Sequence, residues 1–376
     1  MDVIGIICEY NPFHNGHIYH INKIKEMYPD CLLVACISSS FCERGEISIL
    51  NKWDKTFIAL NNNIDLVVEL PFVYSSQSAD TFSYGALKIL NSLNVSKLIF
   101  GSECNDVKTL KDIASLEIND NSFDQKVKYY LDKGNNYPTS LSNAIKEYNL
   151  KTINSPNDLL GISYIKEIIK NNYSIEPITI KRTNNYHSLD TNTNIVSASS
   201  IRNLIKSNID ICDYVPSNVE DKIYRNLDVF KYLKYKILSS DNLNIYQTVD
   251  EGLSGRIKKY INESNTLEEL LDKIKTKRYT YNKLNRMFIH ILTSLTKEEA
   301  KIDIDYVRVL GFNDKGKKYL KSIKDKSVLP IYTNYKKISS KLFDIETRTT
   351  SIYSLIVNDN SLIKKEFYKP LYFTEK

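Results

Sequence analysis

Two histidines, one helical turn apart, stand close to the start of the chain. His14 and His17 flank Gly16, and a short apolar run at residues 3–8 precedes them. Residues three apart on a helix point the same way, so both imidazoles can donate hydrogen bonds to one group. Donors fixed on phosphate oxygens stabilise the charge that develops when a nucleophile attacks phosphorus. The spacing therefore favours chemistry on the phosphate of a nucleotide.

The residues around the histidines predict a strand, a tight turn and a helix. The run 3–8 is rich in Ile and Val without alternating polar residues, which is typical of a strand buried on both faces of a parallel sheet. Pro12 favours a turn, and Gly16 leaves room for a ligand against the backbone. Isoleucines at helical spacing follow, and the unpaired N–H groups of such a helix start favour phosphate.

Other roles for the two histidines are open at this point. A pair at this spacing can bind a metal ion, and a histidine is often only a polar group satisfied within the fold. A zinc protease of the His-Glu-x-x-His type needs glutamate directly after the first histidine, but that position is Asn15. No cysteine pair has zinc spacing. We favour phosphate binding and expect no metal held by the protein itself.

A serine-rich segment, residues 197–202, predicts a second phosphate-binding helix start. Ser199 is a good N-cap, and Arg202 lies one turn into the helix. Hydroxyls, backbone amides and a guanidinium together bind phosphate well, although an ordinary capped helix with an exposed arginine fits equally. Lys52 could likewise reach phosphate or acetate or only face solvent, and Glu69 could orient an amine or a magnesium ion.

Short apolar runs alternate with helical patterns through the first half of the chain. This rhythm predicts an α/β fold, a Rossmann-like doubly wound parallel sheet with helices on both faces. Ligands bind such sheets at the carboxyl ends of the strands, where the turn at 9–17 and Gly101 would lie. The expected strands are 3–8, 31–38, 64–69, 96–101 and 174–180, and the expected helices are 17–28, 53–62, 77–93, 106–117, 122–133, 138–149, 157–171 and 199–207.

A domain boundary is expected near residue 212, because Pro216 and a polar run follow the last of these helices. We predict a catalytic domain at 1–212 and a basic, mainly helical domain at 213–376. Its expected helices are 218–239, 243–249, 252–262, 266–275, 280–294 and 313–324, followed by a strand-like stretch at 327–332 and a final helix near 347–357.

Charge is distributed unevenly along the chain. Residues 1–210 hold 20 Lys and Arg against 23 Asp and Glu, a net of −3, whereas residues 211–376 hold 31 against 22, a net of +9. A basic half fits a polyanionic partner, although lysine-rich surfaces are also common without one. Basic residues interleaved with tyrosines can hold phosphates and stack on unpaired bases. The candidate RNA contacts are Lys277, Arg278, Lys283, Arg286, Lys315, Lys317 and Lys318.

Composition argues against a membrane or an oxidising compartment. The chain has no run of about 18 apolar residues, so no membrane span is expected. Its start lacks the basic segment and cleavage site of a signal peptide. The six cysteines have no paired spacing, which is typical of reduced thiols. We therefore expect a cytoplasmic protein.

The motif around the histidines resembles a known signature at two levels. His-x-Gly-His is the signature of the nucleotidyltransferase superfamily. The longer string Glu9-Tyr10-Asn11-Pro12-Phe13-His14-Asn15-Gly16-His17 is similar to that of the bacterial tRNA(Met) cytidine acetate ligase family. Further agreeing stretches are spread over most of the chain: Arg44-Gly45-Glu46 with Lys52-Trp53, Val68-Glu69-Leu70-Pro71-Phe72, Phe100-Gly101-Ser102-Glu103, the run 155–161 and the run 309–313.

This resemblance implies an enzyme that makes N4-acetylcytidine at the wobble position of elongator tRNA(Met). It implies that acetate and ATP form acetyl-adenylate and pyrophosphate, and that the cytidine amine then releases AMP. Magnesium would accompany ATP, and His14 and His17 would be catalytic. The ATP-binding residues that it implies are Ile7, Cys8, Glu9, Tyr10, Asn11, Pro12, Phe13, His14, Asn15, Gly16, His17, Ile18, Tyr19, His20, Gly101, Asn157, Arg182, Ser199, Ser200 and Arg202.

Two other functions stay open on the residues alone. A small-molecule adenylyltransferase would use the same histidine turn but would not need the basic second half. A non-catalytic RNA-binding protein with a vestigial nucleotide fold would bind tRNA without activating any carboxylate. The sequence does not identify an acetate pocket, a general base for the cytidine amine or an oligomeric state.

Overall fold

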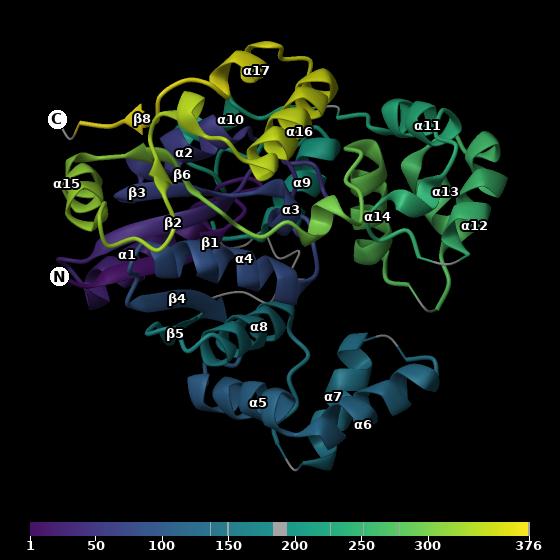
Figure 1. Ribbon diagram of the computed structural model, residues 1–376, viewed down its shortest axis with the longest axis horizontal. Coiled ribbons are helices and arrows are strands. Elements are labelled where there is room, and N and C mark those ends of the chain that lie inside the picture. Colours follow the sequence, from purple (N-terminus) through teal and green to yellow (C-terminus); the bar gives the residue numbers. More distant parts are fainter. Residues whose placement is uncertain are drawn as a thin grey trace.

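Five parallel strands form the centre of the molecule. They are β1 (Val3–Cys8), β2 (Leu32–Ser38), β3 (Leu66–Leu70), β4 (Lys97–Ser102) and β5 (Glu176–Lys181), in the spatial order β5-β4-β1-β2-β3. The computed structural model, shown in Figure 1, describes residues 1–135, 137–148, 150–182, 194–225, 227–250, 252–277 and 279–374. All five predicted strands are confirmed within two residues at each end.

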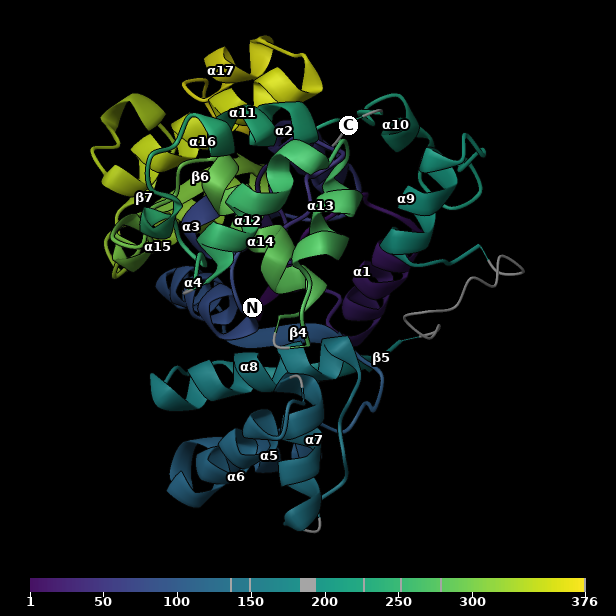
Figure 2. The ribbon, with the colours of Figure 1, turned by 90° about the vertical axis from the view of Figure 1, so that its right-hand side faces the viewer.

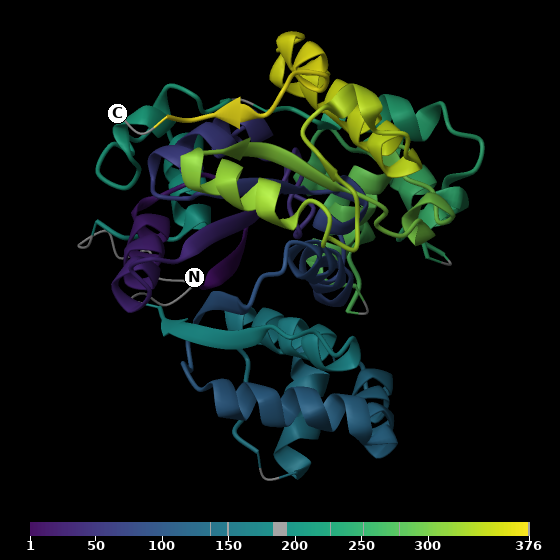
Figure 3. The ribbon, with the colours of Figure 1, turned by 60° about the vertical axis from the view of Figure 1, so that its left-hand side comes forward.

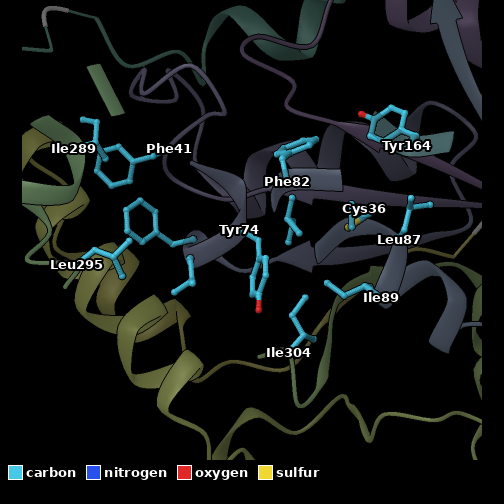
Figure 4. Packing of buried hydrophobic residues seen from close by; sticks show 14 of the residues in the cluster. Cys36, Phe41, Tyr74, Phe82, Leu87, Ile89, Tyr164, Ile289, Leu295 and Ile304 are labelled. Carbon is cyan, nitrogen blue, oxygen red and sulfur yellow. The ribbon is translucent and has the colours of Figure 1, made fainter. Parts of the chain in front are cut away.

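Helices cover both faces of this sheet because successive strand residues point to opposite sides. Leu33 and Ala35 of β2 lie in a core with α1 (Asn15–Met27), α2 (Lys52–Asn61) and α9 (Ala198–Lys206). Leu32 and Val34 lie in the other core with α3 (Phe72–Ser75), α4 (Ala79–Ser92) and α8 (Pro156–Lys170), part of which Figure 4 shows. The predicted doubly wound α/β fold is confirmed.

Three helices project from the β5 side of the sheet. They are α5 (Val107–Asn119), α6 (Asn121–Asp132) and α7 (Tyr137–Glu147), and α5 packs on α8 (Figure 1). Hydrophobic residues Leu110, Ile113 and Phe123 join these helices to the core next to α8. The three helices therefore continue the layer that covers one face of the sheet.

The segment after α9 is helical but more broken than predicted. It holds α10 (Ser217–Glu220), α11 (Phe230–Leu238), α12 (Leu253–Tyr260), α13 (Leu267–Ile274) and α14 (Tyr281–Leu292), with 3-10 turns η1 (Leu243–Ile245), η2 (Ile261–Glu263) and η3 (Glu299–Lys301). The prediction of one helix over 218–239 is wrong. The Tyr224 backbone N–H instead bonds to Ile49 O at 2.9 Å, and its hydroxyl bonds to Asp359, so this stretch is tied to the start of α2.

The chain from Val307 onward returns to the sheet, which the sequence did not predict. Strand β6 (Val307–Phe312) pairs antiparallel with β3, and β7 (Ile331–Tyr332) and β8 (Leu371–Tyr372) pair with β6. Figure 3 shows α15 and β8, in green and yellow, beside strands from the N-terminal half. The other elements are α15 (Asp314–Ile323), η4 (Tyr335–Lys337), α16 (Lys341–Val357) and α17 (Ser361–Lys365). The division at residue 212 stays a prediction, and the two parts that it separates share one sheet.

A buried cluster of charges joins the two parts. Lys52 Nζ lies 2.6 Å from Glu69, 3.1 Å from Glu346 and 2.7 Å from Glu366. Arg308 of β6 contacts Glu69 at 3.1 Å and Glu366 at 2.6 Å. All five side chains are at most 1 % exposed. Neither Lys52 nor Glu69 therefore reaches a ligand, and both bind the sheet to the C-terminal helices.

Candidate active site

A pocket of about 290 Å³ opens at the carboxyl ends of β1, β4 and β5. Parallel strands bring the loops that follow them to this one edge, which is why residues far apart in sequence meet here. The turn after β1 supplies His14 and His17, the end of β4 supplies Gly101, and the start of α9 supplies Arg202. Figure 2 looks onto the side of the molecule that carries α1, α9 and α14.

Both histidines have a defined hydrogen-bonding role at the start of α1. His14 is the N-cap, and its Nδ1 accepts from the Gly16 backbone N–H at 3.0 Å. His17 Nδ1 accepts in turn from the His14 backbone N–H at 3.1 Å. An imidazole nitrogen that accepts carries no proton, so the neutral ring holds its proton on Nε2. The capping arrangement therefore gives each ring an Nε2–H donor.

The surroundings keep these histidines neutral. Burial, with smaller contributions from Arg182 and Arg202, lowers the pKa of His14 to about 3. Burial and then His14 hold the pKa of His17 well below its usual range. The pKa of His20, which also lines the pocket, falls to about 4 through burial. The site thus offers neutral donors rather than imidazolium charges.

Four cationic side chains line the pocket, those of Arg44, Lys181, Arg182 and Arg202. Arg202 donates from Nη1 to Asn11 O at 2.7 Å and from Nη2 to Glu46 Oε2 at 2.5 Å. Arg182 follows β5, and its Nε lies 3.6 Å from Glu103 Oε1. An anionic ligand in the pocket would therefore meet the guanidinium groups of Arg182 and Arg202 together with the other two cations.

The helix that carries Arg202 begins at Ala198, one residue before the predicted start. Ser197 is the N-cap of α9, and its hydroxyl accepts from the Ser200 N–H at 3.1 Å. Ser199 lines the pocket, whereas Ser200 does not. The cap is therefore two residues earlier than the predicted Ser199, and Ser200 supports the helix start.

Gly101 and Asn157 lie beside Arg182. A Cβ added to Gly101 would stand 3.3 Å from Arg182 Cγ. The absence of a side chain at Gly101 therefore makes room for the Arg182 side chain. Asn157 Nδ2 donates to Glu103 Oε1 at 2.5 Å. The sequence missed the residue that holds this loop, Asp158, whose buried carboxylate accepts from the backbone N–H groups of Glu103 and Cys104.

Most of the expected ATP contacts line the pocket, and five do not. Phe13 is fully buried in the core, and the Asn15 side chain donates to the carbonyls of Asn194 and Asp213. Those that line the pocket are Ile7, Cys8, Glu9, Tyr10, Asn11, His14, Gly16, His17, Tyr19, His20, Gly101, Asn157, Arg182, Ser199 and Arg202, and those that do not are Pro12, Phe13, Asn15, Ile18 and Ser200.

Several lining residues carried no signal in the sequence. Phe82 of α4 and Tyr164 of α8 provide apolar wall, and Glu43 provides a carboxylate. The Glu43 carboxylate contacts Arg286 of α14 at 3.0 Å, and burial raises its pKa to about 7. The Glu43 backbone N–H donates to Glu9 Oε1 at 2.6 Å. Only the folding of α14 against this loop could have identified Glu43.

The predicted RNA contacts fall at two separate places. Arg286 reaches the pocket wall through Glu43, and Lys283 is on the same helix. Lys315 of α15 donates instead to the carbonyls of Asp30 and Cys31, which precede β2. Lys317 and Lys318 are on α15 too, at the opposite edge of the sheet from the pocket (Figure 1). Lys277 is exposed. The prediction for Arg278 lies outside the described residues.

The described residues contain neither a candidate metal cluster nor a helix that could span a membrane. No group of three or more His, Cys, Asp or Glu side chains in this part of the chain could hold a metal ion. None of its helices has the length and apolar character needed to cross a bilayer.

The fold and the pocket define a nucleotidyltransferase-type α/β protein, and comparison with known proteins agrees. Residues 1–367 match the model of the HIGH nucleotidyl transferase family. The tRNA(Met) cytidine acetate ligase of Caldicellulosiruptor saccharolyticus is 38 % identical over 400 residues, covering 100 % of both chains. That of Clostridium novyi is 38 % identical over 382 residues, covering 95 % of this chain and 96 % of its own.

Solved structures show the same similarity. The crystal structure of apo TmcAL from Thermotoga maritima superposes with a TM-score of 0.91 at 26 % identity, over 100 % of both chains. The same protein bound with alpha-thio ATP superposes with a TM-score of 0.89. The chain therefore belongs to the tRNA(Met) cytidine acetate ligase family, a family of ligases.

Proposed function

We propose that this protein uses ATP and acetate to acetylate the wobble cytidine of elongator tRNA(Met), giving N4-acetylcytidine, AMP and pyrophosphate. The observation that carries the proposal is the pair of neutral Nε2–H donors at the start of α1, set between Arg182 and Arg202. Donors fixed beforehand stabilise the developing charge on a phosphate without reorganising during the reaction.

In the first step, an acetate oxygen attacks the α-phosphorus of ATP, and the bond to pyrophosphate breaks. His14 and His17 would donate to the phosphate oxygens, and Arg182 and Arg202 would hold the leaving pyrophosphate. Acetyl-adenylate forms because free acetate has no good leaving group, whereas AMP is one. In the second step the cytidine N4 attacks the acetyl carbon, and the bond to AMP breaks.

Magnesium would enter as part of the substrate. Mg²⁺ keeps several waters and binds nucleotide phosphates with only one or two protein carboxylates. The carboxylates that line the pocket, those of Glu9, Glu43 and Glu46, would be the ligands at hand for such an ion. Its charge would offset that of the triphosphate.

The proposal of tRNA as the acetyl acceptor rests on two observations. The related proteins from Caldicellulosiruptor saccharolyticus and Clostridium novyi are named tRNA(Met) cytidine acetate ligases. The second half of the chain carries a net charge of +9, and a basic surface attracts the RNA backbone. A small-molecule adenylyltransferase has no need of such a surface.

The decisive experiment combines the protein with ATP, labelled acetate and tRNA(Met), followed by nuclease digestion. We expect labelled N4-acetylcytidine, and we expect none when ATP is omitted. Acetate-dependent ATP–pyrophosphate exchange should occur without RNA. Label incorporation from acetyl-coenzyme A but not from acetate would contradict the proposal, as would exchange with no carboxylate at all.

A further inference from the structure

A second cavity, of about 690 Å³, lies beside the pocket. It is bounded by the loop before α4, the 247–250 loop, α14 and the segment around η3. The two cavities share walls. In α4, Thr81 lines the second cavity and its neighbour Phe82 lines the pocket. Arg286 also lines the second cavity, and its guanidinium contacts Glu43 of the pocket.

The wall of this cavity contains a polar group without a partner. Gln77 is 5 % exposed, and its side-chain Nε2 has no hydrogen-bond partner among the described residues. A buried amide donor left unpaired is costly, so native proteins rarely keep one without a use. An unpaired amide in the wall of a cavity is suited to pairing with the edge of a nucleobase.

A buried histidine fixes the position of the loop that carries Gln77. His290 of α14 is fully buried, and its Nε2 lies 2.7 Å from Ser76 O, so that nitrogen carries the proton. Its Nδ1 lies 3.0 Å from the hydroxyl of Thr248, which lines the opposite wall. Thr248 itself has a left-handed φ of 68°. One side chain therefore joins both walls, and Gln77 is held beside Ser76.

The rim of the cavity is basic. It is lined by Lys283, Arg286, Lys297 and Lys301, against two carboxylates, Asp250 and Glu298. Lys301 is accessible, with 70 % of its side chain exposed, and its partner Glu298 at 2.8 Å is exposed as well. Such surface pairs are weak and exchange readily for phosphate. The combination of one recessed amide donor and a cationic rim matches one RNA nucleotide, with its base inside and its phosphate at the rim.

We propose that this cavity binds a nucleotide adjacent to the target cytidine, with Gln77 on its base and Lys301 on its phosphate. This inference rests on the proposed function, because it assigns a subsite to the RNA that would be acetylated. A flanking nucleotide held here would place the target cytidine at the mouth of the pocket. Gln77 is then a positioning residue for the second step and takes no part in activation of acetate.

The test uses a short RNA hairpin with the anticodon stem and loop of elongator tRNA(Met). Acetylation of this hairpin is measured for wild type, Gln77→Leu and the matched control Gln125→Leu, which replaces an exposed glutamine on α6. For Gln77→Leu we expect KM for the hairpin to rise about tenfold, the size of one lost hydrogen bond. Acetate-dependent ATP–pyrophosphate exchange without RNA should stay at the wild-type rate, and Gln125→Leu should resemble wild type in both assays.

A second substrate series identifies the base. The nucleotides on either side of the target cytidine are made abasic, one at a time. With wild type, one of these hairpins should have a KM about tenfold higher than the intact hairpin. With Gln77→Leu the same abasic change should raise KM no further, since both changes remove the same hydrogen bond. Lys301→Ala should make the salt dependence of hairpin binding shallower by about one unit of slope.

The outcomes separate the two proposals. If wild type performs no acetate-dependent exchange, the proposed function fails. If wild type acetylates the hairpin but Gln77→Leu has an unchanged KM, or neither abasic hairpin is affected, the subsite is refuted and the function stands. If Gln77→Leu loses exchange as well, Lys301→Ala decides, and an unchanged salt slope refutes the subsite.

Discussion

At the scale of single residues, the two histidines perform two tasks with different atoms. Their Nδ1 atoms accept backbone N–H groups at the start of α1, and their Nε2–H groups are left for a ligand. Capping and catalysis can therefore be separated by substitution, because asparagine caps a helix well but offers no donor at the position of Nε2.

We predict that His14→Asn keeps the fold and loses the chemistry. Acetate-dependent ATP–pyrophosphate exchange should fall about 100- to 1,000-fold, as when one donor to a developing oxyanion is removed. His14→Ala should lose exchange to a similar extent and in addition lose about 1 kcal/mol of stability, because the cap is gone. Urea unfolding measures stability. Exchange near the wild-type rate in His14→Asn would show that capping is the only role of His14.

The lowered pKa values of the histidines predict an acid-sensitive fold. The folded-state pKa of His14 is about 3 and that of His17 is also lowered, whereas an unfolded histidine titrates near 6.5. Protons therefore bind preferentially to the unfolded chain. The resulting contribution to stability is complete above about pH 6.5 and is lost as the pH falls.

His14 should remove roughly 2 kcal/mol of stability between pH 7 and pH 5, and His17 should contribute a loss of the same sign. A variant with both His14 and His17 changed to Asn should lose less stability over this range than wild type. Urea unfolding at the two pH values gives the difference directly. Equal losses for both proteins would mean that these histidines titrate normally in the folded state.

At the scale of elements, the packing of α14 against the 41–47 loop builds one wall of the pocket. Gly45 has a left-handed φ of 72°, and a Cβ on it would stand 2.2 Å from the Arg286 backbone nitrogen. Gly134 has a similar φ of 86°, but a Cβ there would meet nothing within 4 Å. The two glycines share the conformation and differ in contact.

We predict that Gly45→Ala destabilises the protein by about 1–3 kcal/mol more than Gly134→Ala, because the added methyl group overpacks against a helix backbone. Both substitutions carry the common cost of a left-handed alanine, so the difference reports the contact alone. Gly45→Ala should also reduce acetylation, since α14 carries the Arg286 that pairs with Glu43. Equal stability losses in the two variants would contradict this packing.

At the scale of the whole molecule, the buried charges tie the C-terminal third to the sheet. The cluster holds two cations, Lys52 and Arg308, against three glutamates. Burial raises the pKa of Glu69, which favours the neutral form of this carboxyl and reduces the imbalance of charge. The members of the cluster should therefore respond unequally to substitution.

We predict that Lys52→Met costs about 3–5 kcal/mol of stability, because it leaves buried carboxylates without their cation. Glu69→Gln should cost less than half as much, since the amide resembles the protonated carboxyl and removes the excess negative charge. Chemical denaturation of both variants tests this order. A larger loss for Glu69→Gln would show that Glu69 is fully ionised in the fold.

The distribution of the lysines predicts which face of the molecule meets RNA. Lys277 and Lys283 are on the side of α14 and the pocket, whereas Lys317 and Lys318 are on α15 at the far edge of the sheet. Replacing the first pair by Gln should weaken tRNA binding and reduce its salt slope by about two, whereas replacing the second pair should change little. Filter binding over a salt series measures both. Equal effects would indicate an RNA that contacts both edges.

Local patterns in the sequence were sufficient for the parallel strands and most helices. Apolar runs such as 3–8 and helical spacing after His17 are decided by nearby residues, and the structure confirms them. Strand β6 was missed because Arg308 interrupts its apolar pattern, and only Glu69 and Glu366, both distant in sequence, make that burial possible. The helix predicted over 218–239 was broken for a similar reason, by contacts of Tyr224 with distant residues.

The sequence by itself determined the histidine turn, the parallel sheet and the family, because each depends on residue types at short, regular spacing. Only the tertiary structure decided which atoms of the histidines are left for a ligand, that Lys52 is an internal anchor, and that Gln77 stands unpaired in a second cavity. The histidine nitrogens are occupied by backbone N–H groups within three residues once α1 has formed, whereas the burial of Lys52 depends on partners as distant in sequence as Glu346. A hydrogen-bond donor is available to a ligand only when the fold leaves it unpaired, and no local pattern records that.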